Sequence, residues 1–280
     1  MHERTSQGIL SRPEQMAILE TKQLTRKFGS STVVDSLNFT VEAGEAFALL
    51  GPNGAGKTTA IKMLTTLLPV TSGDAFIGGF SITDHPNKVR CLIGYVSQML
   101  SVDGTLTGVE NLMLFARLYD IPSNECKTRV WEALGFMGLT DAARKPVNEY
   151  SGGMIRRLEI AQSMIHRPPV LFLDEPTVGL DPIACKTVWE HIAQLQKECK
   201  TTILMTTHFM DEAEHLCNRI AFMSRGKIVA TGTPQALKDS INKPDAKLED
   251  AFIHYTSETL SEGNDYTNIS RERKTAERLG

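Results

Sequence analysis

Residues 51 to 59 read Gly51-Pro52-Asn53-Gly54-Ala55-Gly56-Lys57-Thr58-Thr59, which has the spacing G-x-x-x-x-G-K-T. An apolar run from Ala46 to Leu50 precedes this loop, and apolar residues at helical spacing follow it. The order strand, loop, helix lets backbone N–H groups and the positive end of a helix meet a polyphosphate. Lys57 would reach the β- and γ-phosphates, and Thr58 would offer its hydroxyl to Mg²⁺. The segment therefore predicts a nucleoside triphosphate site.

The overall composition is that of an ordinary globular chain. Its 280 residues are 41% hydrophobic and 22% charged, and the net charge of −3 gives no reason to expect binding to nucleic acid. The apolar runs are the length of strands, so no membrane span is predicted. The five cysteines are odd in number and form no C-x-x-C pair. This pattern favours reduced cytosolic thiols over disulfides or a zinc site.

Short strands and helices alternate along most of the chain. Residues 18–28 and 33–41 alternate apolar and polar side chains, which predicts an antiparallel β-region near the N-terminus. Nearly continuous apolar runs, typical of strands covered on both faces, recur at 45–50, 170–174 and 202–206. Strands that alternate with helices favour a mostly parallel sheet with helices on its faces. The predicted class is α/β, with a P-loop NTPase core.

Changes in composition and periodicity along the chain suggest where its domains begin and end. Residues 1–16 carry charges and few apolar anchors, so we expect a flexible leader. A nucleotide-binding domain is expected over 17–240, and an inserted helical subdomain over about 99–166, where helical periodicity dominates. Residues 241–280 form a C-terminal extension, predicted as a short helix followed by a disordered tail. No internal repeat is found, so one nucleotide-binding unit is expected.

Two carboxylates, Asp174 and Glu175, end the apolar strand at 170–174. Ligands of open α/β sheets bind at this end of the strands. Asp174 can hold Mg²⁺ through water, and Glu175 can polarise the attacking water as a general base. Two solubilising acids at a strand end are the simpler alternative, but the phosphate loop upstream favours the catalytic interpretation.

A second glycine-rich segment, Ser151-Gly152-Gly153, opens a predicted helix. Ser151 has the chemistry of a helix N-cap, and the two glycines expose backbone N–H groups. Taken alone, the segment favours a simple helix cap.

Taken together, the motifs resemble those of the ATP-binding subunits of ABC transporters over about residues 18–232. They occur in the order of that family: the phosphate loop, Gln98, Ser151-Gly152-Gly153, Asp174-Glu175, Gly179-Leu180-Asp181 and His208. The resemblance implies ATP and Mg²⁺ as ligands. It also implies a dimer of two copies, in which Ser151, Gly152 and Gly153 of one copy grip the γ-phosphate of ATP bound to the other.

The resemblance further assigns roles to single residues. Gln98 would sense Mg²⁺ and the membrane partner, Asp181 would lie across the dimer, and His208 would sit near the γ-phosphate. Phe28 would stack on adenine, where the family usually has Tyr, and Met154 stands where the family usually has Gln. Structural alternatives remain open, because Asp181 is also a good N-cap, His208 could be a satisfied structural histidine, and Phe28 could be core.

Three segments resemble the daunorubicin-resistance-type, or ABC-2, exporter ATPases. They are Tyr150 to Glu159 (YSGGMIRRLE), residues 178–182 and residues 248–252. This resemblance implies a multidrug exporter subunit that hydrolyses ATP and lies on the inner face of the membrane through a separate permease. The alternative is a soluble ABC ATPase acting on ribosomes or DNA. Such proteins usually carry two cassettes or a long coiled-coil insert, and this chain shows neither.

Overall fold

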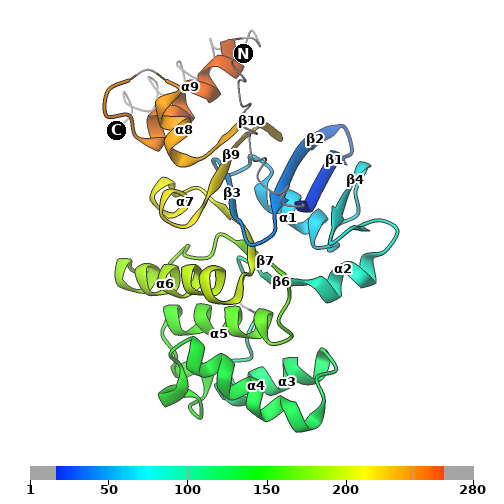
Figure 1. Ribbon diagram of the computed structural model, residues 1–280, viewed down its shortest axis with the longest axis vertical. Coiled ribbons are helices and arrows are strands. Elements are labelled where there is room, and N and C mark those ends of the chain that lie inside the picture. The colour runs from blue at the N-terminus through cyan, green and yellow to red at the C-terminus, as the bar shows by residue number, and fades with distance from the viewer. Residues whose placement is uncertain (1–16, 100, 242, 262–280) are drawn as a thin grey trace, which may run out of the picture.

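Two β-sheets and a group of helices form the part of the chain that the computed structural model describes, residues 17–99, 101–241 and 243–261 (Figure 1). The predicted leader and most of the predicted disordered tail lie outside these residues. No helix within the described ranges is both long enough and apolar enough to cross a membrane. All five cysteines are free, as their pattern predicted.

The smaller sheet has the strand order β2-β1-β4-β5 and is antiparallel. Its strands are β1 (Ala17–Phe28), β2 (Ser31–Glu42), β4 (Ser72–Ile77) and β5 (Phe80–Ser81). Gly29, with φ of 57°, makes the tight turn between β1 and β2, and Phe28 pairs with Ser31 across it. The predicted N-terminal antiparallel region is therefore confirmed.

The larger sheet has the order β10-β9-β3-β8-β7-β6. Its strands are β3 (Ala46–Leu50), β6 (Ile93–Val96), β7 (Val170–Asp174), β8 (Thr202–Thr207), β9 (Arg219–Ser224) and β10 (Lys227–Gly232). Only the β9–β10 pair is antiparallel in this sheet as described. Leu50 pairs with Thr207 and Asp174 with Thr206, so the carboxyl ends of β3, β7 and β8 lie side by side. The segments that follow these strands must meet at one edge.

Helices cover the larger sheet and extend from one end of it (Figure 1). They are α1 (Lys57–Leu64), α2 (Pro86–Leu92), α3 (Gly108–Leu118), α4 (Ser123–Phe136), α5 (Gly152–Met164), α6 (Pro182–Cys199), α7 (Met210–Leu216), α8 (Pro234–Asp239) and α9 (Leu248–Ser261), with short 3-10 turns at Thr140–Ala142 and Val147–Glu149. α3, α4 and α5 gather beyond the β6 end of the sheet (Figure 1). Our sequence analysis did not predict α2, which buries only Val89 and so lacks an apolar stripe.

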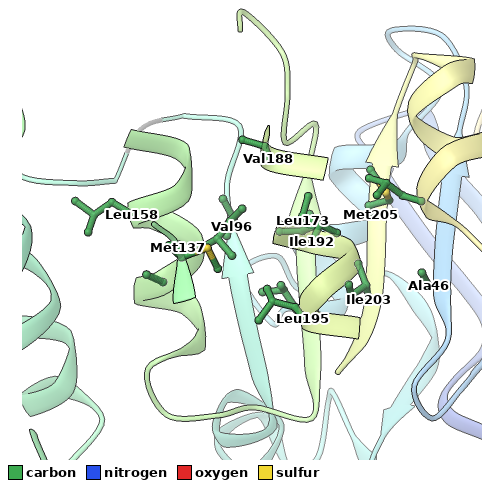
Figure 2. Packing of buried hydrophobic residues seen from close by; sticks show 14 of the residues in the cluster. Ala46, Val96, Met137, Leu158, Leu173, Val188, Ile192, Leu195, Ile203 and Met205 are labelled. Carbon is green, nitrogen blue, oxygen red and sulfur yellow. The ribbon is translucent and has the colours of Figure 1, made fainter. Parts of the chain in front are cut away.

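The larger sheet separates two apolar cores. Along β3, Ala46, Ala48 and Leu50 face one core, whereas Phe47 and Leu49 face the other. This alternation is the period of two expected of a strand, and the continuous apolar run arises because both faces are covered. Figure 2 shows the first core, where β3, β6, β7 and β8 pack against α5 and α6. Each fully buried leucine or isoleucine contributes roughly 1.5–3 kcal/mol, so this packing fixes the sheet edge firmly.

Candidate active site

The phosphate loop is the turn between β3 and α1, and its geometry demands glycine at two positions. A Cβ on Gly51 would lie 2.1 Å from the carbonyl oxygen of Met223, and one on Gly56 would lie 2.6 Å from that of Val33. Gly56 also has φ of 101°, in the left-handed region that favours glycine. Gly56 is the N-cap of α1 and has no side chain that could accept hydrogen bonds from the first N–H groups of the helix. These N–H groups therefore remain available to a ligand. The loop is therefore shaped to receive an anion at a helix N-terminus.

Lys57 is the first residue of α1, and its side chain folds back to the loop. Its side chain is 4% exposed, and its Nζ donates to the carbonyl oxygens of Gly51 (2.7 Å) and Pro52 (3.1 Å). The same ammonium lies 3.4 Å from Oε1 of Glu175. Burial lowers the pKa of Lys57, while the charge of Glu175 opposes this shift. A cation is thus held at the loop by backbone oxygens and one carboxylate.

Thr58 and Asp174 meet where α1 approaches the end of β7. Oγ1 of Thr58 donates to Oδ1 of Asp174 at 3.0 Å, and Thr206 donates to the same oxygen at 2.5 Å. Oδ2 of Asp174 is buried and has no hydrogen-bond partner among the described residues. An unused carboxylate oxygen next to a threonine hydroxyl is the kind of donor set that Mg²⁺ prefers. These two predicted metal residues therefore fit the ion.

Glu175 is the point at which the predicted catalytic residues converge. Its Oε1 lies 3.3 Å from Nδ1 of His208, and its Oε2 accepts from Nε2 of Gln98 at 3.3 Å. The backbone of Glu175 has φ of 50°, which is unfavourable for a side-chain-bearing residue, and its N–H donates to the carbonyl oxygen of Thr206 at 3.0 Å. Such strain at a strand end aims a side chain and is typical of functional sites. Gln98 was also predicted as a metal residue, and that role stays a prediction.

A pocket of about 310 Å³ opens above these groups. It is lined by Val33, Asn53, Gly54, Gly56, Lys57, Thr58, Thr59, Gln98 and Glu175. All of these except Val33 were predicted from the sequence. Val33 comes from β2 of the smaller sheet, and no local motif marks it, because only the packing of the two sheets brings it over the loop.

The other glycine segment lies outside the lining of this pocket. Oγ of Ser151 accepts from the N–H of Met154 at 3.3 Å, and Oδ1 of Asp181 accepts from the N–H groups of Ile183 (3.0 Å) and Ala184 (2.9 Å). Both residues are thus N-caps, as their chemistry predicted. A Cβ on Gly153 would lie 2.8 Å from that of Ala184, so the beginnings of α5 and α6 pack closely together. The nucleotide contacts predicted for this segment stay predictions.

Phe28 also lies apart from the pocket lining. Its side chain is 47% exposed at the end of β1, and the guanidinium of Arg26 lies 4.5 Å from the centre of its ring. The core alternative for Phe28 is therefore wrong. The exposed ring can still offer a stacking face, and its role with adenine stays a prediction.

Sequence analysis missed a buried carboxylate next to the site, Glu212 on α7. This residue is fully buried, and its Oε1 accepts from Oγ1 of Thr177 (2.7 Å) and from Nε1 of Trp189 (3.1 Å). Burial raises the pKa of Glu212, although the hydrogen bonds oppose the shift. In the sequence, Glu212 looks like an ordinary acid in the first turn of a helix. Only the packing of α6 and α7 reveals that it anchors the segment after Glu175.

Comparison with known proteins decides the family. The family described as ABC transporter matches residues 34–178, more than half of the chain. The chain belongs to the ABC transporter family. Its fold is also that of solved ABC cassettes, which confirms the predicted α/β class and the resemblance on which we based the residue roles.

Three similar ABC proteins illustrate this relationship. The probable multidrug ABC transporter ATP-binding protein YbhF of Escherichia coli (strain K12) is 43% identical over 242 residues, 84% of this chain and 41% of that protein. The chain thus spans less than half the length of this relative. The daunorubicin/doxorubicin resistance ATP-binding protein DrrA of Streptomyces peucetius is 41% identical over 86% of this chain and 74% of that protein. The ATP-binding cassette MJ0796, solved as a dimer in a post-hydrolysis state with ADP and Pi, is 26% identical with a TM-score of 0.68, over 77% of this chain and 98% of that one.

Proposed function

We propose that this ABC protein hydrolyses ATP to ADP and phosphate and thereby powers an exporter of the ABC-2 type. The single observation that carries the proposal is the environment of Glu175. Its carboxylate lies within 3.4 Å of Lys57, Gln98 and His208, beside the pocket above the phosphate loop. Names given to relatives, which refer to multidrug transport and daunorubicin resistance, support the export function. They favour it over the alternative of a soluble ABC ATPase acting on ribosomes or DNA.

In the proposed reaction, Lys57, Thr58, Asp174, Glu175 and His208 have separate roles. Lys57 binds the β- and γ-phosphates together with the loop amides from Gly51 to Thr59, and it exchanges its bonds to loop carbonyls for phosphate oxygens. Thr58 and Asp174 would hold Mg²⁺, which would neutralise phosphate charge when bound. Glu175 accepts the proton of the attacking water as general base, and His208 positions its carboxylate through Oε1.

The dimer is a second part of the proposal. Ser151, Gly152, Gly153 and Asp181 do not line the pocket of their own chain, and Ser151, Gly152 and Asp181 are exposed. In a two-fold dimer the same surfaces meet twice, so these residues would complete the pocket of the second copy. The dimeric structure of MJ0796 supports this arrangement. Phe28 would contribute by stacking on the adenine of the ATP bound to its own chain.

The permease is the third part. We infer that the chain works at the inner face of the membrane by binding a separate membrane-spanning subunit. Three exposed apolar side chains lie shortly after Gln98 in the chain: Met99 is 81%, Leu114 46% and Leu118 67% exposed. Gln98 precedes this surface directly, and the hydrogen bond from its Nε2 to Oε2 of Glu175 connects the surface to the reacting groups. A short amphipathic helix of the permease would cover Leu114 and Leu118.

A photo-crosslinking amino acid placed at position 118, and separately at position 194 of α6, tests the permease contact. Both positions are exposed, and the second serves as the matched control on another helix. With the permease co-expressed in membranes, we expect a crosslinked product from position 118 that contains the permease. Crosslinks from position 194 alone would place the permease on α6 and contradict this part of the proposal.

A further inference from the structure

A second cavity lies at the opposite edge of the larger sheet from the phosphate loop. Its volume is about 590 Å³, nearly twice that of the pocket at Lys57. Its floor contains Pro169 and Thr201, which directly precede β7 and β8, whereas Asp174 ends β7 at the other edge. The motifs of the ABC family contribute no residue to its lining. The volume lies in the range of cavities that hold small organic ligands.

The walls of this cavity are apolar and come from the last turns of three helices. The end of α4 contributes Ala133, Phe136 and, just after the helix, Met137. The end of α5 contributes Ala161, Met164 and, just after the helix, Ile165. The end of α6 contributes Leu195 and Cys199. Figure 2 shows Leu195 on α6 and Met137 after α4 within one apolar cluster. Nη1 of Arg157 donates to the carbonyl oxygen of Met137 at 2.7 Å, which fixes one wall. Apolar walls of this kind select an apolar ligand body.

The charged side chains that line the cavity are mostly basic. Three cations, Arg129, Arg167 and Lys200, line it, and Glu132 is the one carboxylate among its described lining residues. Arg167 pairs with Glu132 at 2.9 Å, with both side chains more than half exposed, and Arg129 pairs with Glu125 at 2.7 Å. An exposed pair such as Arg167 with Glu132 is worth little, so this guanidinium can exchange its partner for a ligand at small cost. Arg129 is 24% exposed and bonds Glu125 through two nitrogens, so it is held more firmly.

We propose that this cavity binds a small amphipathic anion, with its apolar body between α4, α5 and α6 and its acidic head at Lys200, Arg129 and Arg167. The head would be a carboxylate or a sulfonate, because planar guanidinium groups bind such oxygens with two parallel hydrogen bonds. A cationic amphiphile would fit the walls equally well and be repelled by the basic side chains. We therefore expect the cavity to prefer an anionic amphiphile over a cationic one.

A purely structural role for the cations gives a different expectation. Arg167 and Lys200 follow the C-terminal ends of α5 and α6, where positive charge offsets the helix dipole. If that were their entire role, removing their charge would change stability and leave ligand binding unaffected. The experiment below separates the two cases.

Cys199 gives a direct readout, because its exposed thiol lines the cavity, and Cys91 on α2 is an exposed thiol outside it. The rate of maleimide addition to each thiol is measured by mass spectrometry of the full chain with increasing laurate, kept below its micelle concentration. We expect laurate to protect Cys199 to a saturating degree and to leave Cys91 unchanged. Dodecyltrimethylammonium, which has the same tail length and the opposite charge, should protect Cys199 much less. Equal protection by both amphiphiles, or none by laurate, overturns the proposal.

Two variants locate the ligand. Lys200→Glu should weaken laurate protection by about 3- to 10-fold, the effect of one exposed charge near the head group. Lys197→Glu makes the same charge change on an exposed residue of α6 that does not line the cavity, and it should leave protection unchanged. Ala133→Phe should place an aromatic ring between the cavity walls and weaken protection, and a thermal unfolding midpoint near that of the parent would show that this variant is folded. Unchanged protection in the folded Ala133→Phe protein would place laurate elsewhere and contradict the proposal.

Discussion

The phosphate-loop region and the Ser151–Gly153 region both carry motifs of the ABC family, but their polar groups are satisfied differently. Lys57 and Glu175 are almost fully buried and contact each other, and Glu175 also contacts Gln98 and His208. Ser151 and Asp181 are exposed, and their side chains accept hydrogen bonds that cap the first turns of their own helices. The first region is organised by contacts within one chain. The second region exposes Ser151 and Gly152 to solvent, which suits a partner surface.

We expect the largest loss of ATP turnover from a change at Glu175, which contacts Lys57, Gln98 and His208. Glu175→Gln keeps the size of the side chain and its ability to hydrogen-bond but removes the base. We expect ATP turnover to fall about 10²- to 10⁴-fold, the range of general-base help. Phosphate release measures the rate, and size-exclusion chromatography with Mg-ATP should show a dimer that persists, because hydrolysis no longer ends it.

Asp174→Asn is the matched control, since it should act through weaker binding of Mg²⁺ and be partly rescued by more of the ion. If Glu175→Gln hydrolyses ATP within a few-fold of the parent rate, another group activates the water. His208, the other partner of Oε1, would then be the next candidate.

The second prediction removes the cation from the same region. Lys57→Ala should weaken binding of a fluorescent ATP analogue by about 10- to 100-fold, because a charged hydrogen-bonding group contributes roughly 1.5–3 kcal/mol. Lys62→Ala changes a lysine of the same helix that does not line the pocket, and it should bind normally. Unchanged affinity in a folded Lys57→Ala protein would remove Lys57 from phosphate binding.

The third prediction tests the outward-facing region. Ser151→Ala should leave ATP binding by the single chain intact and lower turnover by about 10-fold or more, because one hydrogen bond to phosphate across the dimer is lost. Thr233→Ala removes a comparable N-cap, whose Oγ1 accepts from the N–H of Ala236 at 3.1 Å in α8. This control shows what the loss of a cap alone does. Equal losses of turnover in both variants would mean that Ser151 acts only as a cap.

We expect the smallest effect, a change in stability, from substitutions of Glu212, which accepts hydrogen bonds from Thr177 and Trp189. Its folded pKa is raised above the ordinary value of 4.5, so the protonated form is favoured in the folded state. Its contribution to stability is therefore full below pH 4.5 and is lost as the pH rises through the folded pKa. Urea unfolding at several pH values should show that Glu212→Gln removes this loss.

Glu212→Ala provides the contrast. It leaves Oγ1 of Thr177 and Nε1 of Trp189 without their acceptor, which should cost about 1–3 kcal/mol of unfolding free energy. Equal stability of the alanine and glutamine variants would show that these two hydrogen bonds contribute nothing.

The sequence by itself was enough to predict the phosphate loop, because its motif lies in nine consecutive residues that follow one strand and run into the first turn of one helix. It was also enough to predict the α/β class and the parallel sheet, since buried strands need apolar side chains on both faces. The N-caps at Ser151 and Asp181 are local in the same sense, because each involves only the next three residues.

Tertiary structure alone decided the contacts between distant residues. Gln98 and Glu175 are 77 positions apart, and Glu175 and His208 are 33 apart, so their meeting depends on the spatial order of β6, β7 and β8. Val33 reaches the phosphate loop only because the smaller sheet packs over it. Glu212 becomes a buried acceptor, and the cavity at Cys199 forms, only where helices from separate segments pack together. The physical reason is the same in each case. The burial and the charge state of a side chain depend on its neighbours in space, and the spacing of residues along one strand or helix does not specify those neighbours.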